Sequence, residues 1–141
     1  MADPTEGTPI TVEVTKVCID AGDPARLARF YAALFGSEVR VSDDGWHFLK
    51  PTRPGVVALT IQPVPESKVG KNRVHLDVFV ADPEPAIARC EELGATRLWR
   101  SERPNDWFQV LADPEGNELC ICRPPSFDDQ TFDDQTFDDQ A

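Results

Sequence analysis

The 141-residue sequence lacks any apolar run long enough to cross a bilayer, and its first residues lack the cationic and then apolar pattern of an export signal. Positive charge is also scarce, because 14 Lys and Arg stand against 25 Asp and Glu and give a net charge of −11. Nucleic-acid binding needs clustered cations, so this balance argues against a nucleic-acid partner. We therefore expect a cytoplasmic protein with no membrane segment and a single domain, since this length suits one hydrophobic core.

Cysteine spacings that hold zinc or a disulfide framework are missing as well. The four cysteines, Cys18, Cys90, Cys120 and Cys122, show no CxxC pattern and lie within periodic apolar segments. Without an export signal, such residues are typical of reduced thiols that pack as small apolar side chains. The sequence therefore argues against a disulfide-rich secreted fold.

Negative charge is concentrated at the C-terminal end, where residues 126–141 read SFDDQTFDDQTFDDQA. Six aspartates of this segment supply six of the eleven net negative charges, so the rest of the chain carries about −5. Three acidic pentapeptides are too polar to bury, and we expect the tail to be disordered. The alternative is a linear motif whose phenylalanines bind a groove on a protein partner.

The rest of the chain repeats one layout twice. In each copy an alternating apolar segment precedes an Asp-Pro pair that begins a helix, and three further extended segments follow. The Asp-Pro pairs at 23–24 and 82–83 lie 59 residues apart, and the segments ALTIQPVP and ELCICRPP lie 60 residues apart. A nearly constant offset indicates an internal duplication.

We predict an α+β fold of two tandem β-α-β-β-β modules that form a curved eight-stranded sheet around a cleft, with the helices outside. The first strand is expected to run from Thr11 to Asp20, and Gly36 is expected to end the first helix. The expected boundaries are a lead-in at 1–10, a domain at 11–125 with modules at 11–65 and 72–125, and an acidic tail at 126–141.

Because side chains alternate along a strand, the residues that face the cleft can be predicted. In the first strand Val17 and Ile19 should face the helix, so their neighbours should face the cleft. The same count assigns to the cleft Lys16, Cys18, Asp20, Ala58, Thr60, Gln62, His75, Asp77, Phe79, Glu118, Cys120 and Cys122. Trp46 and Trp107 occupy similar places in the two modules and are candidates for pocket walls, with core filling as the alternative. His47 alternates away from Trp46 and is expected at the surface.

With these motifs the chain resembles the vicinal-oxygen-chelate superfamily of glyoxalase I, extradiol dioxygenases and bleomycin-resistance proteins. The similarity is greatest to bacterial glyoxalase-like domains. It rests on DPARLARFYAALFG, KNRVHLDV and LADPEGNELCIC and covers residues 11–125. The resemblance implies a homodimer. In metal-dependent members it also implies one metal ligand from the first and one from the last strand of each module, which here correspond to Lys16, Ala58, His75 and Glu118.

Two of these four positions carry no metal donor, because a lysine ammonium has no free electron pair and alanine has no polar side-chain atom. We therefore expect no cofactor. The alternative is a divalent Zn, Fe, Ni or Mn ion held by His75 and Glu118, with a thiolate from Cys18 or Cys120. Residues two apart on a strand differ in position by about 6 to 7 Å, so such a replacement would not reproduce the inherited geometry.

Two functions follow from this set of residues, and whether the protein is an enzyme stays open. The first is binding of a small organic molecule in the cleft, with Lys16 balancing the charge of Glu118. Its ligand-binding residues would be Lys16, Cys18, Gln62, Asp77, Cys120, Trp46 and Trp107, beside His75 and Glu118.

The second function is that of a lyase, isomerase or dioxygenase with an atypical site, in which His75 and Glu118 act as catalytic acid and base. In that case Asp77 would orient His75, although Asp77 could equally pair with Arg73 or Lys16. A buried ionic network without chemistry is a further alternative.

Overall fold

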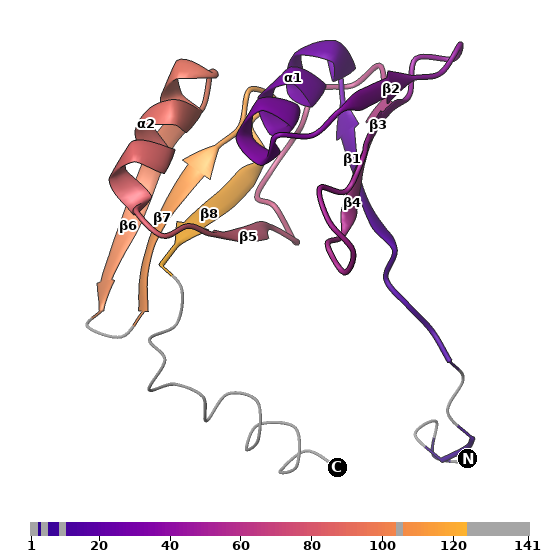
Figure 1. The fold of residues 1–141 in the computed structure, drawn as a ribbon, viewed down its shortest axis with the longest axis horizontal. Helices are drawn as coiled ribbons and strands as arrows, with labels where there is room; N and C mark the ends of the chain where they lie inside the picture. Colours follow the sequence, from indigo (N-terminus) through magenta and orange to yellow (C-terminus); the bar gives the residue numbers. More distant parts are fainter. Residues whose placement is uncertain (1–2, 4–5, 9–10, 104–105, 124–141) are drawn as a thin grey trace.

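The computed structural model describes residues 3, 6–8, 11–103 and 106–123, and Figure 1 shows their arrangement. The acidic tail at 126–141 lies outside the described residues, so its disorder and its partner stay predictions. The elements follow in the order β1 (Lys16–Ala21), α1 (Pro24–Phe35), β2 (Val39–Val41), β3 (His47–Leu49), β4 (Ala58–Pro63), β5 (Leu76–Phe79), α2 (Pro83–Glu92), β6 (Thr96–Arg103), β7 (Asp106–Ala112) and β8 (Glu118–Cys122).

These strands form two four-stranded sheets with equivalent topology, β1-β4-β3-β2 in the first module and β5-β8-β7-β6 in the second. In both sheets the first strand of the module pairs in parallel with the last, and the other neighbours pair antiparallel. The predicted α+β fold of two tandem β-α-β-β-β modules is confirmed. The eight strands are divided between two hydrogen-bonded sheets, one in each half of the molecule in Figure 1.

The first helix, α1, begins and ends where the sequence predicts. Asp23 accepts a hydrogen bond from the Arg26 amide at 3.1 Å, Pro24 opens the helix, and Gly36 with a φ of 67° ends it. The apolar stripe of α1 faces the core, and its buried members are Leu27, Ala28, Phe30 and Tyr31. Neither helix in the described part of the chain has the length and apolar character needed to span a bilayer.

The predicted alternation of the strands is confirmed by burial. Val17 and Ile19 pack against the hydrophobic core, whereas Lys16, Cys18 and Asp20 are exposed. In the second module the helix-facing side chains pack in the same cluster, and they are Leu76, Val78, Val80, Leu119 and Ile121. The two modules therefore share one core on the helix side, and their other sheet faces carry polar side chains such as Lys16 and Asp20 together with exposed apolar ones such as Phe79.

One predicted boundary is wrong. β1 begins at Lys16 and not at Thr11, and the side chains of Val12 and Val14 are 74% and 77% exposed. The register of β1 with β4 starts at the pair Lys16 and Ala58. Earlier residues thus have no neighbouring strand in the described part of the chain, and alternation alone does not make a strand without a partner.

The surface position predicted for His47 is also wrong. Its side chain is only 9% exposed, because His47 pairs with Ile61, whose fully buried side chain points toward the helix. His47 Nδ1 lies 3.0 Å from the carbonyl oxygen of Gly45, which gives the buried ring a polar partner.

The turn between β7 and β8 joins the second module to the first. The Tyr31 hydroxyl of α1 donates a buried hydrogen bond to Asp113 Oδ2 at 2.8 Å. Asp113 Oδ1 accepts from the amides of Glu115 and Asn117 at 2.8 and 3.0 Å, which closes the turn. Burial raises the pKa of the Asp113 carboxyl, and its hydrogen bonds oppose that shift.

The same turn also contacts the beginning of α1. Glu115 Oε1 accepts a hydrogen bond from the Asp23 amide at 2.6 Å, and the Arg26 guanidinium donates to the Pro114 carbonyl. Arg26 further lies 3.8 Å from Glu115 Oε2. We call these contacts, together with the Tyr31–Asp113 hydrogen bond, the intermodule clasp. The clasp shows that the LADPEGNE motif serves to hold the modules together.

Candidate functional site

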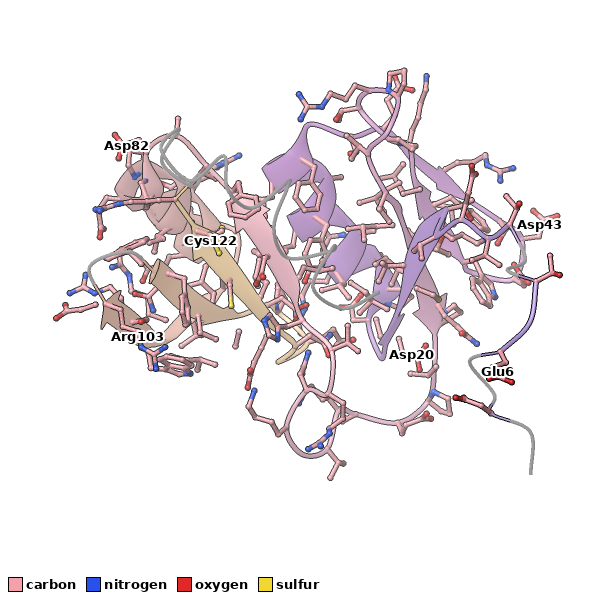
Figure 2. The ribbon with its side chains drawn as sticks, turned by 90° about the horizontal axis from the view of Figure 1, so that it is seen from below. Glu6, Asp20, Asp43, Asp82, Arg103 and Cys122 are labelled. Carbon is pink, nitrogen blue, oxygen red and sulfur yellow. The ribbon has the colours of Figure 1, made fainter. Side chains whose placement is uncertain are left out.

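A hollow of about 380 Å³ lies between the two modules, and we call it the intermodule hollow. Strand β1, the segment 64–74 that connects the modules, and the β7–β8 turn all contribute to its wall. Asp20 in β1 and Cys122 in β8 mark the first and second modules in the view of Figure 2. The polar residues that matter most in the wall are Cys18, Asp20, Glu66, Lys68, His75 and Glu118. Carboxylates outnumber cations in this set, so the wall of the hollow carries net negative charge.

His75 and Asp77 form a pair at the edge of this hollow. His75 Nε2 lies 3.3 Å from Asp77 Oδ1, and both side chains are about half exposed. Asp77 thus contacts His75, as one sequence alternative proposed, and its contacts within the described residues include no ion pair with Arg73 or Lys16. The pair gives the imidazole a fixed partner, which is how a histidine is oriented for binding or proton transfer.

Cys120 lies beside this pair. Asp77 and Cys120 are register partners on the parallel strands β5 and β8, and the ligand atoms of His75, Asp77 and Cys120 all lie within 4.8 Å of one another. We call these three residues the His–Asp–Cys cluster. The Cys120 side chain is 5% exposed, and burial together with the charge of Asp77 raises the pKa of its thiol to about 12.

Glu118 has a different cationic partner from the one predicted. The ammonium group of Lys71 contacts Glu118 Oε2, and the Glu118 side chain is only 16% exposed. Lys16 forms no ion pair within 4.0 Å in the parts of the chain described, at 11–103 and 106–123. The predicted charge balance between Lys16 and Glu118 is therefore wrong, because Lys71 takes that place.

Lys16 instead borders a second hollow, of about 430 Å³, on the open face of the first sheet. This hollow, which we call the first-module hollow, also receives Ala58, Phe48 and Arg40. The Arg40 guanidinium carbon lies 4.9 Å from the centre of the Phe48 ring. The four positions expected at one metal centre are thus divided, since Lys16 and Ala58 border one hollow while His75 and Glu118 border the other.

Cys18 and Gln62 come together on adjacent strands of the first module. The Cys18 thiol donates a weak hydrogen bond to Gln62 Oε1, with a donor–acceptor distance of 3.9 Å. Burial and the charge of Asp20 raise the pKa of this thiol, and the charge of Lys16 opposes the shift. Cys18 reaches the intermodule hollow, and Gln62 is placed to orient it.

The two tryptophans differ from each other. Trp107 packs against the hydrophobic core and carries the Arg123 guanidinium carbon 4.8 Å from its ring centre. Its packing supports core filling, which was the alternative to a pocket wall, because alternation along β7 places Trp107 on the same face as the fully buried Leu111. Trp46 stacks on Phe48 at 6.4 Å between ring centres, near the first-module hollow. Its ligand contact stays a prediction.

Arg40 and Phe48 are residues that the sequence did not assign to a site, and the contact of Lys71 with Glu118 is a further feature that it did not predict. Lys71 and Glu118 are 47 positions apart, and no local pattern connects them. Alternation could have found Phe48, because Phe48 pairs with Thr60, which was already assigned to the open face.

Comparisons with known proteins agree with this architecture. A family model described as a glyoxalase-like domain matches residues 16–122. A glyoxalase/bleomycin resistance protein/dioxygenase family enzyme from Burkholderia phytofirmans has 18% identity and a TM-score of 0.67, with 79% of this chain and 98% of the other covered. A lactoylglutathione lyase from Agrobacterium tumefaciens has 19% identity and a TM-score of 0.58, with 80% and 94% covered. A fosfomycin resistance protein from Mesorhizobium loti has 12% identity and a TM-score of 0.66, with 85% and 98% covered. None of the curated proteins matches this sequence.

Proposed function

Because the chain belongs to the glyoxalase-like domain family, we propose that it binds a small organic molecule in the intermodule hollow without the four-ligand metal centre of its superfamily. The observation that supports this proposal is a hollow of about 380 Å³ that both modules line and that receives His75 and Glu118. This volume is in the range of small-molecule sites. Apolar side chains of Val17 and Leu76 supply contact area beside the polar groups.

The residues at the four superfamily positions do not fit a metal ion. Lys16 and Ala58 offer no electron pair, and they border a different hollow from the other two positions. Glu118 is held by the ammonium of Lys71, which competes directly with a cation for the carboxylate. No step of the proposed function therefore passes through such an ion.

The charge of the wall indicates the class of ligand. Asp20, Glu66 and Glu118 present carboxylates, and Lys68 is the cation among the described wall residues. A carboxylate that meets an amine or hydroxyl in a partly enclosed hollow forms a charge-assisted hydrogen bond. We therefore favour a polar ligand that carries an amine or several hydroxyl groups over a simple carboxylic acid.

Native mass spectrometry of the purified full chain tests this proposal, because a bound small molecule that is retained adds its mass to the protein. Thermal-shift assays with matched amines and carboxylic acids test the proposed class of ligand. Glu118→Gln and His75→Ala should weaken binding, whereas the matched control Arg40→Gln alters the first-module hollow and should leave it unchanged. Ligand binding that depends on Arg40 and not on Glu118 would contradict the proposed location of the binding site in the intermodule hollow. A preference for carboxylic acids would contradict the ligand class.

An enzymatic function is the second candidate, and the contact of His75 Nε2 with Asp77 at 3.3 Å favours it. An oriented imidazole at the edge of a hollow, with Glu118 nearby in the same wall, can accept and return a proton in a lyase or isomerase reaction. A dioxygenase reaction fits less well, because the usual ligand set is incomplete. If the retained molecule is turned over, His75→Gln should abolish turnover more strongly than it weakens binding.

We further propose that the protein acts as a cytoplasmic homodimer. All four cysteines are free thiols, which suits a reducing compartment. Phe79 and Trp99 are 62% and 55% exposed on β5 and β6, the two edge strands of the second sheet, and a second copy that packs across the whole open face of this sheet would cover both. Light scattering coupled to gel filtration tests the oligomeric state, and a monomer at micromolar concentration would contradict it.

A further inference from the structure

The His–Asp–Cys cluster combines a nitrogen, an oxygen and a sulfur donor on one face of the second sheet. Its ligand atoms all lie within 4.8 Å of one another, and His75 Nε2 lies 3.3 Å from Asp77 Oδ1. Asp77 and Cys120 face each other directly in the parallel register of β5 and β8. The strand pairing itself therefore brings these donors together.

We propose that the His–Asp–Cys cluster binds a borderline transition-metal ion of the Zn²⁺ class through the imidazole, the carboxylate and the Cys120 sulfur, whose thiol proton is released to water as the metal–sulfur bond forms. A tetrahedral zinc ion with bonds of about 2.0 to 2.3 Å separates its ligands by roughly 3.3 to 3.8 Å. The cluster is slightly wider than that, at up to 4.8 Å. Rotation of the half-exposed His75 and Asp77 side chains toward the buried Cys120 closes the difference.

The donor types select the metal. Thiolate and imidazole are ligands that favour zinc and its analogue cobalt over magnesium or calcium, which prefer oxygen atoms. Cys120 is buried, yet it is not part of the hydrophobic core cluster, so its thiol is turned toward the open face that carries His75 and Asp77. Three protein ligands leave a fourth position for water or an added molecule.

This centre is displaced from the four superfamily positions. Asp77 lies two residues after His75, which directly precedes β5, and Cys120 lies two residues after Glu118 in β8, so these two donors are shifted from the superfamily positions by about 6 to 7 Å. Only His75 belongs to both sets. The shifted set needs neither Lys16 nor Ala58, because all three of its ligands come from the second module.

Titration of metal-free full-length protein with Co²⁺ and with Zn²⁺ tests the inference, which does not depend on ligand binding in the intermodule hollow. One cobalt ion per chain should bind with a near-ultraviolet thiolate-to-metal absorption band. Cys120→Ser should remove that band, and Asp77→Asn should weaken binding by about tenfold or more. Two matched controls should keep the band: Cys122→Ser, which changes the next thiol along β8, and Glu118→Gln, which changes a superfamily position.

Circular dichroism of each apo variant establishes that it is folded before titration. Zinc should raise the melting temperature of the wild type and of Glu118→Gln but not that of Cys120→Ser. Cobalt bound without a thiolate band, no binding at all, or loss of binding in Glu118→Gln with retention in Cys120→Ser would each overturn the inference. The last result would mean that the metal ion binds at the superfamily position Glu118 and not at Cys120.

Discussion

Removal of the Tyr31 hydroxyl gives the sharpest test of how the two modules are held together. Tyr31 is 1% exposed and Asp113 is 4% exposed, so their 2.8 Å hydrogen bond lies out of contact with solvent. Tyr31→Phe keeps the aromatic ring, which packs edge-on against Phe30 and stacks on Phe35. The substitution therefore removes one donor from the intermodule clasp and leaves the apolar packing in place.

The expected loss follows from the charge of the acceptor. A hydrogen bond to a charged group contributes about 1.5 to 3 kcal/mol, and a buried carboxylate that loses a donor keeps its desolvation cost. Asp113 retains the amides of Glu115 and Asn117 after the substitution, which limits the loss. We expect the free energy of unfolding to fall by about 2 kcal/mol at neutral pH, within the range for bonds to charged groups.

Urea denaturation of the wild type, Tyr31→Phe, Asp113→Asn and the double variant measures this energy as a double-mutant cycle. The two single changes should be non-additive by about 1 kcal/mol or more, because both act on one hydrogen bond. Arg29→Gln is a control for changes on α1, since Arg29 is an exposed residue of the same helix. A loss below about 0.5 kcal/mol in Tyr31→Phe, or additive single changes, would refute the reasoning.

The remaining predictions concern the clasp, the wall of the hollow and the tail. Tyr31 is the single tyrosine of the chain, and burial beside the charged Asp113 raises its pKa well above 10, so its ultraviolet titration should begin only at higher pH than that of free tyrosine. Burial raises the pKa of Asp113 in the folded state above its ordinary 3.8, so the folded protein binds more protons than the unfolded chain between the two pKa values. The free energy of unfolding should therefore fall as the pH rises through that range. Urea denaturation at several pH values should show a smaller fall for Asp113→Asn than for the wild type. Lys71→Gln should leave Glu118 without its cation and strengthen the binding of amine ligands in thermal-shift assays, and unchanged affinity would contradict the contact. Deletion from Ser126 onward should reduce pull-down of a tail-binding partner, and equal recovery would end that prediction.

The sequence predicts most of the fold because the determinants of the fold are local. Asp23 and Gly36 mark the ends of α1, and the alternation of Val17 and Ile19 identifies the buried face of β1. The offset between the two Asp-Pro pairs then indicates the duplication, and the duplication predicts that both modules have the same succession of strands and helix. Each of these inferences needs only residues that are close in the sequence or that are related by the nearly constant offset between the two modules.

Contacts that depend on partners far away in the chain are harder to predict. His47 is buried because its register partner is Ile61, and register is set by the whole sheet. Lys71 meets Glu118 because the segment before β5 folds back over β8, and 47 residues separate the two. The sequence identified Lys16 as a changed ligand position, yet it could not show that Lys16 and His75 border different hollows.

The pairing of the first and last strands within each module explains why a donor set can survive in one module alone. Parallel pairing of β5 with β8 holds Asp77 opposite Cys120 whatever the first module contributes, just as pairing of β1 with β4 holds Lys16 opposite Ala58. Contacts between modules depend instead on the shared hydrophobic core and on the clasp, which lies on the helix side around Tyr31 and Asp113. A site that needs both modules is therefore lost when either module changes, whereas a site built on β5 and β8 needs only those two strands. The second module thus carries imidazole, carboxylate and thiol donors side by side, whereas the first has Lys16 and Ala58 at the positions where the resemblance implies metal ligands.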